Sequence, residues 1–360
     1  MTFNFSPLCL LPAPRRRAAG LRSLAAVPAV VALLLAGAAC GRKDGVASGT
    51  LRVGYFANIT HAQAIIGRAK GTFEAKTGLP VAYKVFNAGP TEMEALLAGE
   101  IDIAYVGPNP AINAYLRAGK GALRIVAGAT SGGASLVVRR ELGLRAPADL
   151  KGRTVASPEL GNTQDITLRA WLKQQGFTPG TDVKVKPVKN PEILMLFRQG
   201  SLDAAWVPEP WATRLCREAG GEILIDETSL WPGGRFTTAV LVVREDWVRQ
   251  RPDVVRKFVE AHVETTRWSL DHPAEAVDVI RAGLEAVMQK PLSREILSEA
   301  FSRMKLTWDP GVASMRESAA RARDLGYLPP GYGPDDIGGL FELAPLGAVL
   351  QAMNLPPVQP

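Results

Sequence analysis

The stretch that decides the fold is Gly99-Glu-Ile-Asp-Ile-Ala-Tyr-Val106, because it recurs as Gly200-Ser-Leu-Asp-Ala-Ala-Trp-Val207. The two copies lie 101 residues apart, and Pro90 and Pro191 keep the same offset before them. Short apolar runs bounded by turn residues are typical of buried strands. The repetition predicts two similar halves, and coincidence of five identities at one offset is the alternative.

Alternating apolar segments predict the same order of elements in each half. Strands are expected at 51–56, 81–86, 101–106 and 124–129, then at 153–157, 182–188, 203–207 and 222–226, with helices between them. This order is typical of an α/β protein whose parallel sheets are covered by helices. Ligands bind outside the carboxyl ends of such strands, so two lobes side by side predict a small-molecule cleft.

Two β-rich segments, 134–139 and 237–244, end in the same Val-Val-Arg, and we interpret them as the crossing strands of a hinge. The apolar spacing over 247–270 predicts one amphipathic helix after the second crossing. Further helices are expected near 273–289 and 293–304. Proline and glycine then accumulate, which predicts a frayed tail after about residue 345.

The N-terminus has the pattern of an export signal. Residues 1–39 contain four arginines and no acidic residue, and an apolar run of about a dozen residues precedes Cys40. That run is too short to span a bilayer, which needs roughly 20 residues. Small residues before Cys40 predict lipid attachment there, and 41–50 would be a polar tether. Plain cleavage after Ala39 is the alternative.

Charge and cysteine usage narrow the class of protein. Without residues 1–39 the chain keeps 38 Lys+Arg against 35 Asp+Glu, and no basic stripe with interleaved aromatics predicts a nucleic-acid partner. Cys9 would leave with the signal, so Cys216 stays without a disulfide partner. Three scattered histidines predict no metal site, and no cofactor is expected.

Four loops at strand ends lead into predicted helix starts and carry residues that cap helices: 57–63 with Asn58 and Gln63, 107–111 with Pro108 and Asn109, 161–165 with Asn162, Thr163 and Gln164, and 208–211 with Glu209 and Trp211. Exposed helix amides and the helix dipole favour an anion at such ends. Capping alone explains any single loop. Four equivalent loops favour a site.

Other candidate site residues have more than one interpretation. The segment 130–135, with Ser131, Gly133 and Ser135, either brings backbone close to a ligand or forms a hinge turn. Glu209 beside an anion would receive an amine, bond a backbone amide or hold a cation. His61 either starts a helix or touches the ligand. Cys216 is predicted to be a buried structural thiol rather than a nucleophile.

These residues resemble the substrate-binding proteins of the nitrate, sulfonate and taurine class of ABC importers. The resemblance covers roughly 50–310 and rests on Gly54-Tyr-Phe with Asn58, on 97–108, on Asp149-Leu-Lys-Gly152 and on Asp203-Ala-Ala-Trp-Val-Pro-Glu-Pro-Trp211. It implies the periplasmic-binding-protein fold with two similar lobes and a ligand cleft. By analogy, the cleft residues would be Asn58, Gln63, Pro108, Asn109, Ser131, Gly133, Ser135, Asn162, Thr163, Gln164, Glu209 and Trp211.

The resemblance also implies a division of the chain: a signal peptide at 1–39, a tether at 40–49, a discontinuous lobe I at 50–134 and 240–325, lobe II at 135–239 and a C-terminal tail at 326–360. The implied function is capture of a small anionic ligand outside the cytoplasm and delivery to a permease and its ATPase. A lipid-anchored monomer without enzymatic activity is expected. The alternative is a cleft enzyme of this fold, of the desulfinase or thiamine-precursor synthase kind.

Overall fold

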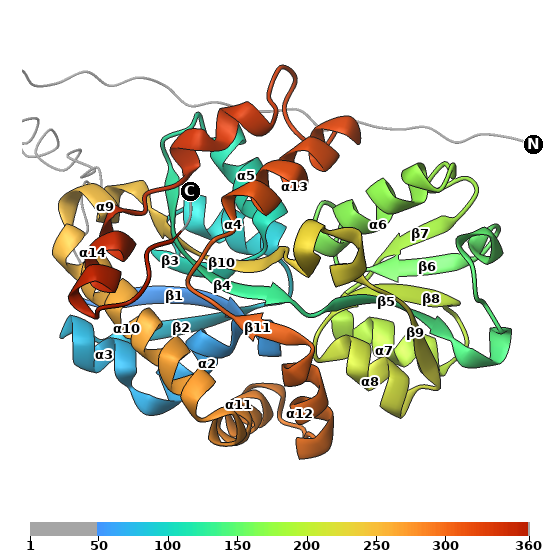
Figure 1. Cartoon of the computed structure of the whole chain (residues 1–360), viewed down its shortest axis with the longest axis horizontal. Helices are drawn as coiled ribbons and strands as arrows, with labels where there is room; N and C mark the ends of the chain where they lie inside the picture. Colours follow the sequence, from blue (N-terminus) through green and yellow to red (C-terminus); the bar gives the residue numbers. More distant parts are fainter. Residues whose placement is uncertain (1–48, 359–360) are drawn as a thin grey trace, which may run out of the picture. The chain divides into compact units, whose positions relative to one another are not determined.

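The computed structural model describes residues 49–358. The predicted export signal, Cys40 and most of the tether lie outside the described residues. Within them the chain forms two sheets (Figure 1), in the orders β11-β4-β10-β3-β1-β2 and β7-β6-β8-β5-β9. The fold is therefore α/β with two lobes, as predicted.

All eight predicted strands are present within about two residues of their expected ends. The first sheet contains β1 (Leu51–Phe56), β2 (Val81–Phe86), β3 (Ile103–Val106), β4 (Leu123–Gly132), β10 (Thr237–Arg244) and β11 (Met304–Leu306). The second contains β5 (Ala134–Arg139), β6 (Thr154–Ser157), β7 (Lys184–Pro187), β8 (Ala204–Pro208) and β9 (Gly221–Asp226).

The five strands of the second sheet repeat the order of β4, β10, β3, β1 and β2 in the first, and β11 has no counterpart among the described residues. In the first, β1 pairs in parallel with β2 and β3, and β10 runs antiparallel between β3 and β4. In the second, β6 pairs in parallel with β7 and β8, and β5 runs antiparallel between β8 and β9. The two Val-Val-Arg segments are thus equivalent strands, one in each sheet, and each lies beside a passage of the chain between lobes.

The repeated aspartate explains why the sequence repeats. Asp102 Oδ2 accepts a 2.9 Å hydrogen bond from the amide of Arg52, and Asp203 Oδ2 accepts a 2.7 Å bond from the amide of Thr154. Asp102 therefore ties β1 to the start of β3, and Asp203 ties β6 to the start of β8. The glycines three residues earlier adopt positive φ, 72° at Gly99 and 75° at Gly200, which favours glycine there.

Helices cover both faces of each sheet. In the first lobe they are α2 (Ala62–Lys70), α3 (Thr72–Thr77), α4 (Gly89–Leu97), α5 (Pro108–Arg117), α9 (Glu245–Gln250), α10 (Pro252–Asp271), α11 (Pro273–Met288), α12 (Arg294–Ser302), α13 (Val312–Asp324) and α14 (Ala344–Ala352), with the 3₁₀ helices η1 (Ile59–His61) and η6 (Pro334–Leu340). In the second they are α6 (Thr163–Gln174), α7 (Asn190–Arg198) and α8 (Trp211–Glu218).

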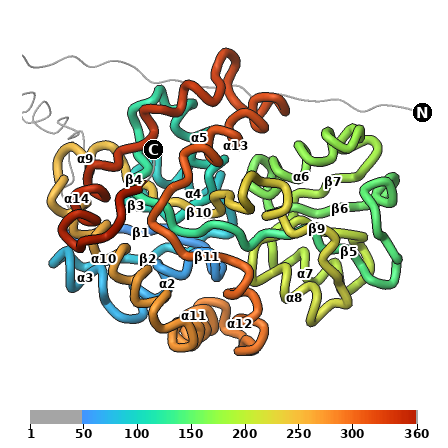
Figure 2. Tube along the Cα trace, in the orientation of Figure 1, coloured from blue at the N-terminus to red at the C-terminus, as the bar shows by residue number. Residues whose placement is uncertain are grey.

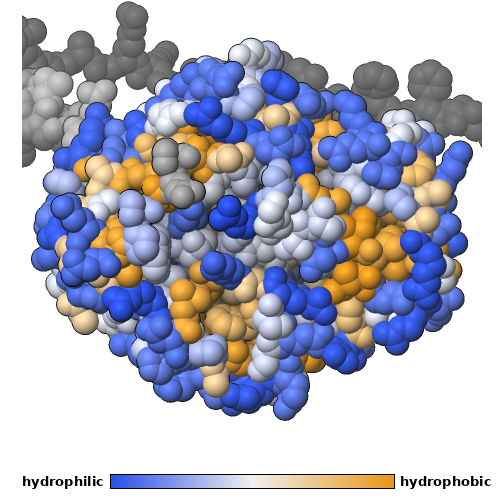
Figure 3. All heavy atoms as spheres, viewed as in Figure 1, coloured by the Kyte–Doolittle hydropathy of each residue, from blue (hydrophilic) through white to orange (hydrophobic). Residues whose placement is uncertain are grey.

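Separate apolar cores lie on the two faces of each sheet. The largest joins β1, β3 and β10 to the helices that follow the second passage, and the Phe73 ring stacks on Phe258 at 4.2 Å between centroids. The tube in Figure 2 shows how the chain returns to the first lobe after β9. On the face seen in Figure 3, hydrophobic patches are interrupted by hydrophilic residues.

Two expectations about helices are wrong in detail. The segment 247–270 is two helices, because Pro252 lacks an amide hydrogen and begins α10 as its first residue. The frayed tail after about 345 is also wrong: α14 buries Leu346, Val349 and Leu350 in the core beside α10. The helix is short and follows a stretch rich in proline and glycine, so its apolar pattern was not recognised in the sequence.

Candidate functional site

A small enclosed cavity lies between the lobes at the carboxyl ends of the strands. Its volume of about 10 Å³ has room for about one water molecule. The lining comes from the loops after β1, β2, β3, β6, β7 and β8 and from the start of β10: Phe56, Asn58, Thr60, His61, Asn87, Gly107, Asn162, Thr163, Gln164, Asn190, Pro208 and Thr238. This is where α/β sheets bind ligands.

Two buried oxygens in this lining have no hydrogen-bond partner among the described residues. They are Thr163 Oγ1, at the first residue of α6, and Asn190 Oδ1, at the first residue of α7. Both side chains are about 95% buried. Leaving a buried polar group unpaired costs roughly 1–3 kcal/mol. The Thr163 hydroxyl can donate to an anionic ligand, whereas Asn190 Oδ1 only accepts and would pair with a donor group of the ligand or with a water molecule.

The lobes approach each other closely at Gly107 of the first lobe. A Cβ at this position would overlap Thr163 Oγ1 of the second lobe. Glycine is therefore required for the closed arrangement, and it lets the start of α5 face the start of α6.

His61 supplies a neutral ring to the cavity. The amide of Phe56 donates a 3.1 Å hydrogen bond to His61 Nδ1, so the proton of the neutral ring is on Nε2. Burial lowers the pKa of His61 to about 3. The ring also stacks on Phe56 at 4.4 Å. It is therefore a hydrogen-bond donor without charge at neutral pH.

Among residues 49–358, no lysine, arginine, aspartate or glutamate lines the cavity. The groups that face it are amides, hydroxyls and one neutral imidazole, at the starts of η1, α6 and α7. Asn162 Nδ2 donates to Gln164 Oε1 at 3.3 Å, which leaves the Gln164 amide nitrogen for another acceptor. Helix N-termini and neutral donors of this kind can hold an anion without a counter-charge.

Direct contacts hold the two lobes together around the cavity. Trp211 Nε1 donates to Asn58 Oδ1 at 2.8 Å, and Thr91 Oγ1 donates to Glu159 Oε1 at 3.0 Å. Trp211 and Glu159 belong to the second lobe. The cavity is thus closed by contacts between side chains of both lobes.

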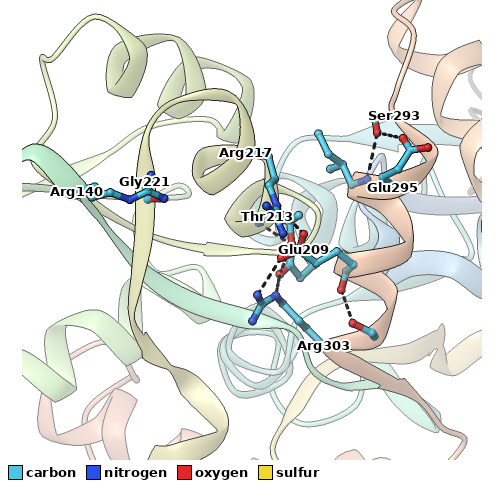
Figure 4. Close-up of polar contacts among 11 residues, drawn as sticks. Arg140, Glu209, Thr213, Arg217, Gly221, Ser293, Glu295 and Arg303 are labelled. Atoms are coloured by element: carbon cyan, nitrogen blue, oxygen red, sulfur yellow. Dashed lines mark hydrogen bonds and ion pairs between the residues drawn. The ribbon is translucent and has the colours of Figure 1, made fainter.

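Ion pairs in and next to α8 and α12 form a second connection between the two lobes (Figure 4). Arg303 Nε lies 3.7 Å from Glu209 Oε1, and Arg217 Nε donates to Glu299 Oε2 at 2.8 Å. Arg303 also bonds Glu299 at 3.1 Å. Two arginines and two glutamates therefore alternate across the boundary between the lobes.

Glu209 serves the start of α8 rather than the cavity. Its carboxylate accepts 3.0 Å bonds from the amide and the hydroxyl of Thr213. Burial raises the pKa of Glu209 to about 7, although the bonds from Thr213 and the charge of Arg303 act in the opposite direction. Of the three roles considered from the sequence, bonding a backbone amide is the one that the geometry supports.

Four of the twelve predicted ligand residues line the cavity: Asn58, Asn162, Thr163 and Gln164. Trp211 reaches it indirectly through Asn58. Gln63 turns away to the carbonyl of Ala129 at 2.7 Å, and Asn109 turns to the carbonyl of Ser318 at 3.1 Å. Pro108 is the first residue of α5, Ser131 and Ser135 lie in strand pairings, and Gly133 is in the turn between β4 and β5; all four are outside the lining.

Sequence reasoning left Asn190, Asn87, Thr60 and Thr238 out of the site. A signal existed for Asn190, because Asn190-Pro191 stands where Gly89-Pro90 stands in the first copy of the repeat, at a helix start. Asn87 and Thr238 carry no such signal, since their neighbours give no capping pattern. Thr60 was recognised only as a cap.

Within residues 49–358 no group of three or more histidines, cysteines or acidic residues could hold a metal ion. The helices of the same part of the chain include none long and apolar enough to cross a membrane. Cys216 is a free thiol, and burial raises its pKa to about 11.

Two repeated lobes closing on a polar cavity define the class of two-lobe ligand-binding proteins. The comparison with known families agrees, because residues 44–282 match the model of the NMT1-like family. The chain belongs to the NMT1-like family.

Several proteins with similar sequences are named as ligand-binding proteins. The taurine-binding periplasmic protein of Escherichia coli is 28% identical over 210 residues, which are 58% of this chain and 64% of that protein. A putative aliphatic sulfonates-binding protein of Bacillus subtilis is 29% identical over 60% of this chain and 64% of its own length. The alignments thus span slightly less than two thirds of these relatives.

A solved structure supports the fold. The periplasmic nitrate-binding protein NrtA of Synechocystis PCC 6803 superposes with a TM-score of 0.74 at 18% identity, covering 87% of this chain and 91% of that chain. The predicted fold is confirmed.

Proposed function

We propose that this protein is an extracytoplasmic substrate-binding protein of an ABC importer, which captures a small oxyanion of the sulfonate, taurine or nitrate type. The observation that carries the proposal is the uncharged, donor-lined cavity between two lobes, in which the Thr163 hydroxyl lacks a partner. The names of the relatives support the ligand class and the delivery to a permease and its ATPase.

A thermal-shift panel tests the ligand class. Nitrate, bicarbonate, taurine, methanesulfonate and aromatic sulfonates are added separately to the purified protein. A ligand at a hundredfold excess over its Kd stabilises the folded state by about 2.7 kcal/mol, so its melting temperature rises. At least one of these oxyanions is expected to give a saturable shift. The absence of a shift with every one of them contradicts the proposal.

The same proposal includes a lipid anchor at Cys40, after removal of 1–39, and a two-lobe division at 50–134 with 240–325 and at 135–239. The sheet memberships of β1 to β11 support the division. Cys40→Ser is expected to release the protein from membranes into the soluble extracytoplasmic fraction. Membrane association that survives this change would refute the anchor.

The second candidate function is a cleft enzyme of the same fold. Its nucleophile would have to face the cavity, and the only free thiol of the described residues, Cys216, is absent from the lining. Turnover of a sulfinate by the purified protein, abolished by Thr163→Val and kept in Cys216→Ala, would favour the enzyme.

A further inference from the structure

A groove of about 890 Å³ lies next to the cavity and is also built by both lobes. The first lobe contributes the end of β2 and one side of α4, and the second contributes the loop after β6, the end of β7 and the start of α7. The groove and the cavity share Asn87, and the adjacent residues Lys189 and Asn190 line the groove and the cavity respectively.

The two spaces differ greatly in size. In this arrangement of the lobes the cavity has room for about one water molecule, so a sulfonate or nitrate head enters it only if the lobes separate slightly. The groove already has the volume of ordinary ligand pockets, roughly 300–1,000 Å³. For the part of a ligand beyond a head group held at Thr163, the groove is an adjoining space of sufficient volume. The Thr91–Glu159 hydrogen bond joins the two walls of this space.

The groove has apolar surface that the part of a ligand beyond its head group could contact. Val85 is 39% exposed and Leu160 is 54% exposed, although large hydrophobic side chains are usually more buried. Phe86, Ala95 and Val188 add further apolar contact. Covering this surface with carbon atoms removes it from water, which favours binding in proportion to the area covered.

The charges of the groove exclude a second anionic group. Its lining contains four glutamates and two lysines, so its formal net charge is −2. Lys84 and Glu100 pair with each other at 2.5 Å. Glu94 and Glu192 form no ion pair within residues 49–358. An uncharged or amine-bearing substituent therefore suits the groove, and a carboxylate or second sulfonate does not.

We infer that the groove is the subsite for the organic substituent of the ligand, so that the protein selects oxyanions with an uncharged or amine-bearing chain of several carbons over inorganic oxyanions. The inference rests on the proposed function, because it places the anionic head in the cavity. Leu160 and Val85 are its specificity-determining residues.

The test is a titration calorimetry series with straight-chain 1-alkanesulfonates from one to eight carbons. Affinity is expected to rise about two- to fourfold for each added methylene over the first several carbons. Leu160→Asn and Val85→Asn are expected to flatten this rise while changing the affinity for methanesulfonate by less than about twofold. Butane-1,4-disulfonate is expected to bind at least about fivefold more weakly than butanesulfonate.

Leu97→Asn is the control, because Leu97 is 43% exposed at the end of α4, a helix that lines the groove, but is itself outside the lining. It is expected to keep the wild-type rise. An affinity that does not change with chain length in the wild type overturns the inference and leaves the proposed function standing. Equal flattening in Leu97→Asn also overturns it. Failure of every oxyanion to bind refutes the proposed function itself.

Discussion

Replacing Thr163 tests whether its hydroxyl binds the ligand or stabilises the fold. Because Thr163 Oγ1 is buried without a partner, Thr163→Val removes no hydrogen bond of the described protein and is expected to leave its melting temperature unchanged or higher. The same change is expected to weaken binding of the tightest oxyanion of the panel by roughly 1–3 kcal/mol, measured by calorimetry.

Arg139→Ala is the comparison for Thr163→Val. Arg139 ends β5, away from the cavity, and its guanidinium lies beside Glu141 and Gly200. Its loss is expected to change affinity less than Thr163→Val does. If Arg139→Ala abolished binding and Thr163→Val left it unchanged, a salt-bridge clamp would replace the neutral-donor mechanism.

His61 gives a prediction about pH. Because burial holds the pKa of His61 near 3 and no other titratable group lines the cavity, the charge of the lining is constant between pH 5 and pH 8. Glu209, whose pKa is about 7 and which faces Arg303 across the lobes, is outside the lining but titrates within this range. In a Glu209→Gln background the affinity for a sulfonate is therefore expected to stay within about twofold over this range. Calorimetry at pH 5, 6.5 and 8 checks this, and tighter binding at pH 5 that His61→Gln removes would show a protonated ring.

Residue chemistry could be predicted from the sequence only in part. The run Asn162-Thr163-Gln164 was found because cap residues at a strand end mark a helix start. Capping chemistry does not say where a side chain points, so Gln63 and Glu209 were placed in the site although they bond Ala129 and Thr213. Direction depends on packing from distant segments, which local patterns do not contain.

At the scale of the element, α4 carries a carboxyl that the fold isolates. Glu92 is fully buried, both of its oxygens lack partners among the described residues, and burial raises its pKa well above 4.5. The strand beneath it has Gly54, where a Cβ would lie 2.6 Å from Glu92 Oε1. The protonated form is thus the one that the folded protein favours.

Glu92 therefore makes folding stability depend on pH. The folded state keeps this proton above pH 4.5 while the unfolded state releases it, so the free energy of unfolding falls as the pH rises, by up to about 1.4 kcal/mol per unit. Glu92→Gln is expected to reduce the fall in melting temperature between pH 5 and pH 8. Parallel melting curves for the two proteins would contradict this.

The elements themselves followed from periodicity more completely than the side chains did. The strands of both halves were expected because each is a short apolar run between turn residues. The break at Arg251 was missed although Pro252 marks it locally, and the helix at 344–352 was missed because it depends on tertiary packing against the first lobe. The spacing of apolar residues predicts which face of a helix or strand is buried, but not which other element packs against that face.

At the scale of the whole molecule, the ion pairs between α8 and α12 influence how readily the lobes close. Glu299→Gln weakens the pair with Arg217, which spans the lobes, and the pair with Arg303 at the end of α12; both are partly exposed and individually weak. Ligand affinity is expected to fall about two- to fivefold at low salt, because the closed form is less populated. The difference should disappear in 1 M salt, where charges are screened.

Glu295→Gln is the matched control on the same helix. Glu295 Oε2 accepts a bond from Ser293 of the same helix cap and makes no ion pair within the described residues (Figure 4). This variant should bind as the wild type does at both salt concentrations. An equal loss of affinity in both variants would indicate a general effect of charge on α12 rather than a contact between lobes.

The central position of β10 decides which lobe is completed first as the polypeptide emerges from the ribosome or an export channel. All five strands of the second lobe lie between residues 134 and 226, whereas β3 and β4 have unpaired edges until 237–244 inserts between them. The second lobe can therefore complete its sheet before β10 has emerged, whereas the first lobe cannot. A fragment spanning 134–236 should unfold cooperatively in isolation, and one spanning 49–132 should not.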